Sequence, residues 1–184
     1  MKIDYSDRMV IWEWDAFVIK IELPDIIHAE YHKDENIVIV YSGENFISKT
    51  IFYYSLEGKL LGQQNLLEGT LDWNHNGKHE VIFHHLHCLR FSPKYQRIFS
   101  ILRSSSNFDI PSELEIYNLE GEKIYQIESP AGFTMQYISE ISKEKLRIVC
   151  EALKEDYFDK YGRSDFYFNL DLETRKWIKE GVAY

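Results

Sequence analysis

The sequence predicts an all-β fold of about fourteen antiparallel strands arranged in four-stranded repeat units. The main observation is a repeated phrase: residues 54–60 (YSLEGKL) recur as residues 117–124 (YNLEGEKI), and a looser copy follows at 168–177 (FNLDLETRKW). Each copy combines an aromatic-rich strand, a tight turn and a second strand, which is the pattern of a β-hairpin. Aromatic residues make up 15% of the 184 residues, and this enrichment favours strands over helices.

Two more strands are expected before each repeated hairpin, so that each unit holds four. The middle strands are predicted at 37–41, 97–102 and 146–150, and the first strands at about 26–31, 81–91 and 135–141. Residues 10–14 and 17–21 have the pattern of the last two strands of a further unit. We therefore expect one domain over 1–184, with a fragmentary unit at about 1–25 and repeat units at about 26–70, 71–130 and 131–184. A single helical turn is expected near 153–160.

One turn carries a family resemblance. Residues 89–98 (LRFSPKYQRI) resemble the first turn of blades in WD-repeat and related β-propellers, where an apolar residue, Phe, Ser and Pro precede a short polar turn. The resemblance implies an open or partial β-propeller, because closed propellers have at least about four blades and this chain offers three and a fragment. The alternative is one strongly twisted sheet folded over itself.

Composition limits the range of functions. The net charge of −9 argues against nucleic acid as a partner, because phosphate binding requires clustered Lys and Arg. Cys88 and Cys150 are expected to be buried, reduced thiols. No apolar run approaches the ~18 residues of a membrane helix, and the first residues do not resemble a signal peptide, so we expect a cytoplasmic protein with no membrane contact.

One segment resembles a metal-binding loop. Residues 72–80 (DWNHNGKHE) resemble the calcium loops of FG-GAP-type propellers, and the resemblance would make Asp72, Asn74, Asn76 and Glu80 the oxygen ligands. The favoured interpretation is an Asn-Gly turn between two strands, which that dipeptide supports unaided.

The histidines are a second metal candidate. Residues 84–88 (HHLHC) are predicted on a strand, where alternation places His85 and His87 on one face, and His75 or His79 could complete a zinc site. Their spacing matches no structural zinc pattern, so packed imidazoles are expected instead. We predict neither a metal nor a cofactor.

Catalytic signatures are missing from the sequence. It contains no Gly-x-Ser-x-Gly elbow, no His-Glu-x-x-His, no phosphate loop and no dinucleotide fingerprint. We therefore expect a protein that is not an enzyme. A small hydrolase or carbohydrate-binding protein stays open as an alternative, with Trp12, Trp14 and Trp73 stacking on a sugar ring from a concave face.

The repeat sorts the loops into two ends with different charge. At one end, windows 42–48, 65–80, 103–113 and 151–165 hold eleven acidic and five basic residues, a net of −6. The short turns at the other end hold eight acidic and ten basic residues, a net of +2. The aromatics of the acidic end are Phe46, Trp73, Phe108, Tyr157, Phe158 and Tyr161. Rings surrounded by charge are typical of protein interfaces, although these rings could also turn inward.

These features predict a protein-binding site and a type of protein. The expected partner-binding residues are Phe108, Asp109, Glu155, Asp156, Tyr157, Phe158, Asp159 and Tyr161. In size, charge and missing catalytic motifs the chain resembles the bacterial immunity proteins of contact-dependent growth inhibition and related toxin systems. The resemblance implies a monomer or weak dimer that neutralises a basic toxin, such as a nuclease, by covering its active site with acidic residues. The alternative is a propeller-type scaffold that joins other proteins.

Overall fold

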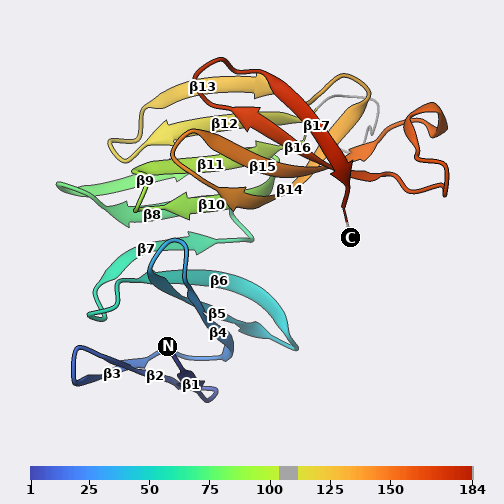
Figure 1. Ribbon diagram of the computed structural model, residues 1–184. Helices are drawn as coiled ribbons and strands as arrows, with labels where there is room; N and C mark the ends of the chain where they lie inside the picture. The colour runs from blue at the N-terminus through green and yellow to red at the C-terminus, as the bar shows by residue number, and fades with distance from the viewer. Residues whose placement is uncertain (104–111, 184) are drawn as a thin grey trace. The chain divides into compact units, whose positions relative to one another are not determined.

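The protein is described here by a computed structural model of residues 1–103 and 112–183, and the fold is all-β (Figure 1). Within those residues the chain forms seventeen strands and one short 3₁₀ helix. The strands are β1 (Ile3–Tyr5), β2 (Met9–Trp14), β3 (Phe17–Glu22), β4 (Ile26–His32), β5 (Ile37–Glu44), β6 (Ile47–Tyr54), β7 (Leu60–Asn65), β8 (Thr70–Asn74), β9 (Lys78–Ile82), β10 (Leu86–Ser92), β11 (Arg97–Leu102), β12 (Glu113–Asn118), β13 (Lys123–Glu128), β14 (Phe133–Ile141), β15 (Lys145–Ala152), β16 (Asp165–Asp171) and β17 (Trp177–Val182), and the 3₁₀ helix is η1 (Glu155–Tyr157). Each pair of hydrogen-bonded strands is antiparallel, and its two strands are consecutive in the sequence, as the hairpin repeat predicts.

The chain divides into two compact units, Met1–Ile82 and Phe83–Tyr184. The first unit contains a three-stranded sheet, β1-β2-β3, and a six-stranded sheet that runs from β4 to β9 in sequence order. Its core joins Val10 and Trp12 of β2 to Val38 and Val40 of β5. The Trp12 indole Nε1 donates a hydrogen bond of 2.7 Å to the Leu56 carbonyl, so this large ring is buried with its polar atom satisfied.

The second unit contains two four-stranded sheets, β10-β11-β12-β13 and β14-β15-β16-β17. Strand β14 packs against β10 and β11, which brings the apolar faces of the two sheets together. The shared core consists of Phe99, Ile101, Leu114, Ile116, Phe133, Met135, Ile138, Leu146, Ile148, Cys150, Ala152, Phe166, Phe168 and Leu170. Full burial of one such Ile or Phe side chain contributes about 1.5–3 kcal/mol, so this cluster dominates the stability of the unit.

The strands of the second unit show why these segments form sheets. In β16, Phe166, Phe168 and Leu170 are buried while the residues between them are half-buried, which is the period-2 alternation of a strand with one apolar face. In contrast, four consecutive residues of β11, Ile98 to Ile101, are buried because neighbours cover both faces of this inner strand. The outer strands β13 and β17 contain no buried residue.

The hairpin predictions are confirmed, whereas the four-stranded layout holds for only two of the four sheets, since β4–β9 form one six-stranded sheet and β1–β3 a three-stranded one. The three repeated phrases form the hairpins β6–β7, β12–β13 and β16–β17, and each middle strand falls where expected. The 3₁₀ turn η1 lies inside the predicted helical segment at 153–160. Neither cysteine forms a disulfide, and burial raises the pKa of the Cys150 thiol to about 12, so this thiol stays protonated and unreactive.

Three strands, β1, β8 and β9, were not predicted from the sequence. The single strand predicted at about 81–91 is wrong. The segment 81–91 is not one strand, because β9 ends at Ile82, residues 83–85 turn, and β10 begins at Leu86. His85 adopts a φ of 62°, a left-handed conformation that breaks a strand. The strands β8 and β9 extend the sheet of the first unit beyond residue 70, since β8 pairs with β7 and β9 pairs with β8. The Asn-Gly turn joins these two strands, as expected, but the hairpin belongs to the sheet of the first unit and not to the next repeat unit.

The turn between β5 and β6 places a large apolar residue in an unfavourable conformation. Asn45 and Phe46 have φ values of 51° and 62°, the geometry of a two-residue type I′ turn. Glycine is the preferred second residue of this turn, because a side chain in the left-handed region costs about 1–2 kcal/mol. Packing of the Phe46 side chain within its own unit does not offset this cost, since the residue is 92% exposed.

We expect Phe46→Gly to stabilise the first unit by about 1 kcal/mol, because it relieves the left-handed strain without removing a packed side chain. The midpoint of urea unfolding should rise accordingly. Phe17→Gly is the matched control: Phe17 is also exposed, but its φ is not positive, so glycine there should cost about 0.5–1 kcal/mol. A lower midpoint for Phe46→Gly would show that the ring packs in solution.

Candidate functional site

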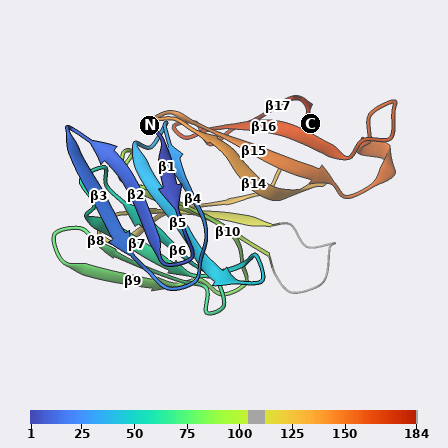
Figure 2. The same ribbon diagram turned by 90° about the horizontal axis from the view of Figure 1, so that it is seen from below.

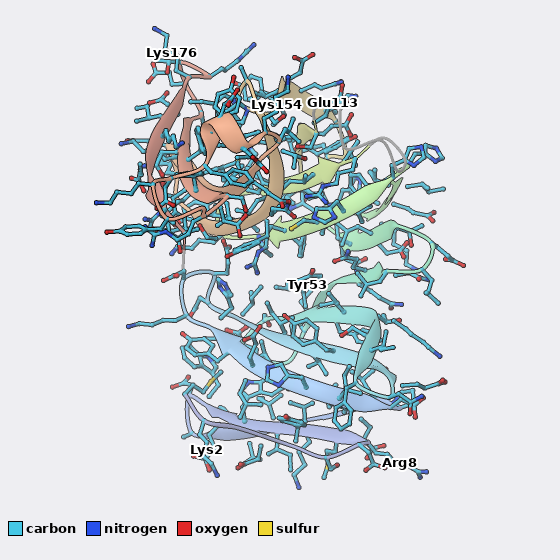
Figure 3. All side chains as sticks on the ribbon, turned by 90° about the vertical axis from the view of Figure 1, so that its right-hand side faces the viewer. Lys2, Arg8, Tyr53, Glu113, Lys154 and Lys176 are labelled. Carbon is cyan, nitrogen blue, oxygen red and sulfur yellow. The ribbon has the colours of Figure 1, made fainter. Side chains whose placement is uncertain are left out.

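The predicted binding residues that the structure describes gather on one loop, residues 153–164, which joins β15 to β16. This loop lies at one end of the second unit, and the short turns of both sheets lie at the opposite end (Figure 1). Figure 3 views the chain from the side of this loop, with Lys154 and Glu113 labelled there. Phe108 and Asp109, also predicted to contact a partner, lie outside the described residues.

Two acidic side chains of the loop point into solvent. Glu155 and Asp156 form the first two residues of η1, and both are exposed. Neither side chain makes a hydrogen bond or ion pair within residues 1–103 and 112–183. Their carboxylates are therefore available to a positively charged partner.

Two aromatic residues of the loop pack against the second unit, and a third is mostly exposed. Phe158 packs against the core of the second unit, and the Tyr157 ring lies 5.4 Å from the Phe133 ring, measured between centroids. Gly132, with a φ of 82°, makes room for Tyr157: a Cβ atom there would lie 2.6 Å from the tyrosine ring. Tyr161 is different, because 71% of it is exposed. The expectation of rings facing outward thus holds for Tyr161 and also for Tyr157, which is 43% exposed despite its contact with Phe133, whereas Phe158 turns inward.

Asp159 fixes the shape of the loop. Its Oδ1 accepts hydrogen bonds from the backbone N–H groups of Tyr161 and Arg163, each 2.9 Å long. Its Oδ2 accepts from Nη2 and Nε of Arg163 at 2.6 and 2.8 Å. The hydrogen bond from Arg163 lowers the pKa of Asp159 to about 2. Asp159 is therefore a structural residue whose charge is already neutralised, and the sequence signal for this pairing was the i,i+4 spacing of the two residues.

The predicted charge asymmetry holds only in part. Window 65–80 was assigned to one end as a single loop, but it contains β8 and the start of β9, so its 75–77 turn lies at the opposite end of the sheet from residues 66–69. In the second unit, residues 151–165 carry five acidic and three basic residues, a net of −2. Asp159 pairs with Arg163, and Glu151 accepts a hydrogen bond from Gln136. The exposed carboxylates are therefore Glu155, Asp156 and, at the start of β16, Asp165, while Lys154 and Lys160 are exposed beside them.

The calcium-type segment is a hairpin in the structure. Asp72 and Glu80 face each other across the β8–β9 ladder, and Asn74 pairs with Lys78, so these residues lie along two strands and do not surround a common point. The Asn-Gly turn interpretation is confirmed. In the part of the chain that the structure describes, no three His, Cys, Asp or Glu side chains come together in a way that could hold a metal ion.

The histidine and tryptophan expectations need correction. His84 and His85 lie in the turn before β10 and not on a strand, which removes the predicted alternation. Trp12 and Trp73 are each only 2% exposed, so neither can stack on a sugar ring. The Trp73 ring instead stacks on His79, with ring centroids 5.3 Å apart. Only Trp14 of the three is exposed.

Comparisons with known proteins add little about function. No protein-family model and no curated protein matches the chain. Among solved structures, it is similar to the N-terminal domain of Nup159, with 10% identity and a TM-score of 0.45 over 98% of this chain and 57% of that chain. It is also similar to a structure of S. cerevisiae Dbp5 bound to Nup159, Gle1, IP6 and ADP, with 9% identity and a TM-score of 0.43 over 98% of this chain and 60% of that chain.

The chain thus spans less than two thirds of both matched chains. At this level of similarity, the partners of those proteins do not transfer to this chain. Within residues 1–103 and 112–183, no helix has the length and apolar character needed to cross a membrane.

We expect the Asp159 contacts to persist at mildly acidic pH. A carboxyl with a lowered pKa stabilises the loop at every pH above its ordinary value of 3.8, and this contribution disappears as the pH falls toward about 2. The amide signals of Tyr161 and Arg163, followed by NMR during an acid titration, should change with a midpoint well below 3.8. Asp159→Asn should abolish this titration, and a midpoint at the ordinary value would contradict the ion pair with Arg163.

Proposed function

We propose that this chain is a protein-interaction module without enzymatic activity, and that it binds its partner through the loop 153–164. The observation that carries the proposal is a loop that is internally fixed and yet exposes recognition groups. Asp159 holds the backbone at Tyr161 and Arg163, while Tyr157 and Phe158 attach the loop to the sheet. Tyr161, Glu155 and Asp156 remain exposed.

A fixed loop is suited to binding because less conformational entropy is lost on association. Tyrosine is enriched at the energetic centres of protein interfaces, since its ring offers a large contact area and its hydroxyl a hydrogen bond. The Tyr161 ring is also positioned by cations, with Lys160 Nζ 4.8 Å and the Arg163 guanidinium 5.3 Å from its centroid. These contacts support Tyr161 as the anchor of the interface.

The chemistry of the exposed carboxylates supports a basic partner. Glu155 and Asp156 would accelerate the encounter with a positively charged surface, and the net charge of −9 acts in the same direction. More specifically, the partner is a basic toxin nuclease in the cytoplasm, and this chain is its immunity protein. The two carboxylates would then occupy positions where the nuclease binds phosphates.

A second candidate is a scaffold that joins partners without inhibiting a toxin. The observation that favours it is an exposed apolar group at adjacent turns of the first unit, formed by Phe46, Ile47 and Leu67. Leu66 N–H donates to the Lys49 carbonyl, which brings the β7–β8 turn beside the β5–β6 hairpin. An apolar group of this kind fits a partner with an apolar pocket and has no preference for a basic one.

We expect the double substitution Glu155→Lys and Asp156→Lys to slow association with a basic nuclease domain encoded beside this chain by about tenfold at low salt. Stopped-flow association rates and nuclease inhibition would measure the effect. Glu13→Lys with Glu22→Lys is the matched control, because both residues are exposed on β2 and β3 of the first unit and the net charge changes equally.

Equal association rates for the two double variants would exclude the loop as the binding site. Loss of binding in Phe46→Asp, with full binding in the Glu155→Lys and Asp156→Lys variant, would favour the scaffold. If the partner binds through the loop but has no nuclease activity, the chain would be an interaction module and not an immunity protein against a nuclease.

A further inference from the structure

Two large aromatic side chains are exposed at the tip of the β2–β3 hairpin, in the first unit. Trp14 is 38% and Phe17 is 68% exposed. The two residues are opposite each other at the end of the ladder, so their side chains leave the same face of the hairpin, with Cβ atoms about 4.5–5.5 Å apart. Asp15 and Ala16 join them, and their φ values of 48° and 64° are those of a type I′ turn. The hairpin therefore holds two aromatic rings together in solvent.

The turn between β6 and β7 packs against the face of the hairpin that carries these rings. Trp12 and Ile19 are the next pair inward on that face. The Trp12 indole donates to the Leu56 carbonyl, and a Cβ atom at Gly58 would lie only 2.7 Å from Cγ2 of Ile19. In Figure 1 the β2–β3 turn and the β6–β7 turn lie at the same side of the first unit. Residue 57 is thus brought next to the exposed rings.

Glu57 adds a negative charge to this group. Hydrogen bonds from Ser55, from its own backbone N–H and from the Trp14 indole lower the pKa of its carboxyl, so the group is ionised at neutral pH. These three donors are uncharged, so they do not neutralise the carboxylate, which is exposed. The bond from the indole also fixes the Trp14 ring beside this charge. An exposed ring and an ionised carboxylate therefore lie in contact at the hairpin tip.

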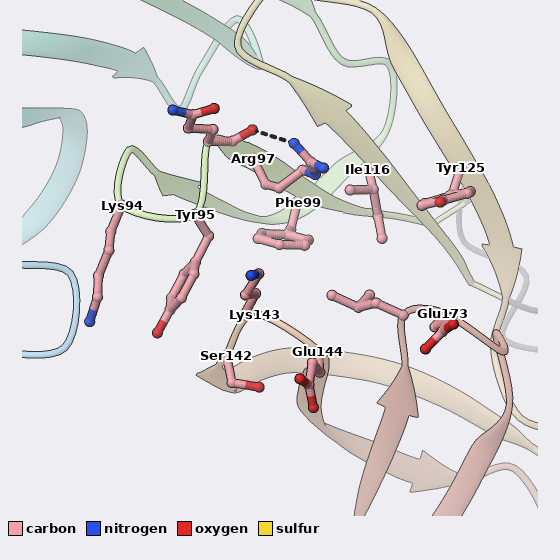
Figure 4. Close-up of a pocket in the computed structure, with 12 residues that line it drawn as sticks. Lys94, Tyr95, Arg97, Phe99, Ile116, Tyr125, Ser142, Lys143, Glu144 and Glu173 are labelled. Atoms are coloured by element: carbon pink, nitrogen blue, oxygen red, sulfur yellow. Dashed lines mark hydrogen bonds between the residues drawn. The ribbon is translucent and has the colours of Figure 1, made fainter.

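A cleft in the second unit has no comparable combination. It has a volume of 480 Å³ and is bordered by residues 94–97, 142–144 and 172–173 (Figure 4). Phe99 and Ile116 are the core residues beneath it, but both are at most 1% exposed, so a ligand in the cleft would not touch them. The rings of the hairpin tip are accessible, which makes the tip the better candidate for recognition.

We propose that the hairpin tip binds an arginine side chain of a partner protein. The guanidinium would stack on the Trp14 ring and donate hydrogen bonds to the Glu57 carboxylate, while Phe17 would cover the aliphatic stem of the arginine. Glu13 takes no part, because it faces the other side of the hairpin. The site lies outside the loop 153–164, so it goes beyond the proposed function and does not depend on it.

The chemistry of the tip favours arginine over other cations. A guanidinium is planar and weakly hydrated, so it stacks on an indole and donates directed hydrogen bonds to a carboxylate at the same time. A lysine ammonium is a compact, strongly hydrated charge that gains less from the ring. A quaternary ammonium group has no hydrogen to donate to Glu57. Only the guanidinium uses both the exposed ring and the carboxylate.

The test is a titration of the full chain with Nα-acetylarginine amide at constant ionic strength, followed by NMR. The Trp14 indole N–H signal and the amide signals of residues 14–18 and 55–58 should shift together with a Kd of about 10 mM, as expected for one stacking contact and one charge-assisted hydrogen bond. Glu57→Gln should weaken binding by about tenfold, because it removes the charge and keeps an oxygen acceptor for the indole. Glu120→Gln is the matched control and should leave the affinity unchanged, since Glu120 is exposed at the same place in the second copy of the repeated turn.

Two further ligands make the proposal falsifiable without any variant. Nα-acetylcitrulline amide has the shape of the arginine ligand without its charge, and Nα-acetyllysine amide has the charge without the planar group. Binding of the arginine ligand about fivefold more tightly than either one would support the site. Equal affinity for the citrulline or the lysine ligand would overturn the assigned recognition. An absence of shifts at the hairpin tip with about 50 mM arginine ligand would overturn it as well.

Discussion

The packing of two four-stranded sheets through β14 is the contact on which the rest of the second unit depends. Each antiparallel sheet has one apolar face that needs cover, and β14 brings the face of its sheet against β10 and β11. Figure 2 shows the same two sheets from a second direction. Burial of Met135, Ile138 and Ile148 at this contact fixes the register, because a shift of one residue would turn these side chains to the outside. The position of the loop 153–164 follows from it, since this loop lies at one end of the unit and the short turns lie at the other (Figure 1).

The loop 153–164 shows how a binding surface can be rigid and exposed at once. Asp159 and Arg163 satisfy backbone groups that an exposed loop would otherwise offer to water, and Phe158 anchors it to the core. Tyr157 also packs on Phe133, whereas Glu155, Asp156 and Tyr161 remain exposed. The opposite end reaches rigidity differently, because its short hairpin turns stand directly on buried strands.

The polar segment 72–80 illustrates a general difficulty of reading hairpins from sequence. Its oxygen-bearing residues recur at alternate positions, which fits both a calcium loop and the outward face of two short strands. The structure selects the strands because β8 pairs with β7 and completes a ladder of backbone hydrogen bonds. Trp73 is decisive here: its ring is buried against His79, and a loop at the surface could not bury it.

The sequence by itself determined the class of the fold and most of its strands, because apolar alternation and tight-turn residues such as Glu57-Gly58 and Glu120-Gly121 are local signals. It also located the loop whose exposed residues are the candidate site. Only the tertiary structure decided that Asp159 is paired, that Trp12 is buried, and that residues 94–97, 142–144 and 172–173 enclose a cleft. These properties depend on contacts between residues far apart in the chain or on the direction of a single side chain. A pattern of residue types along the sequence does not specify either one.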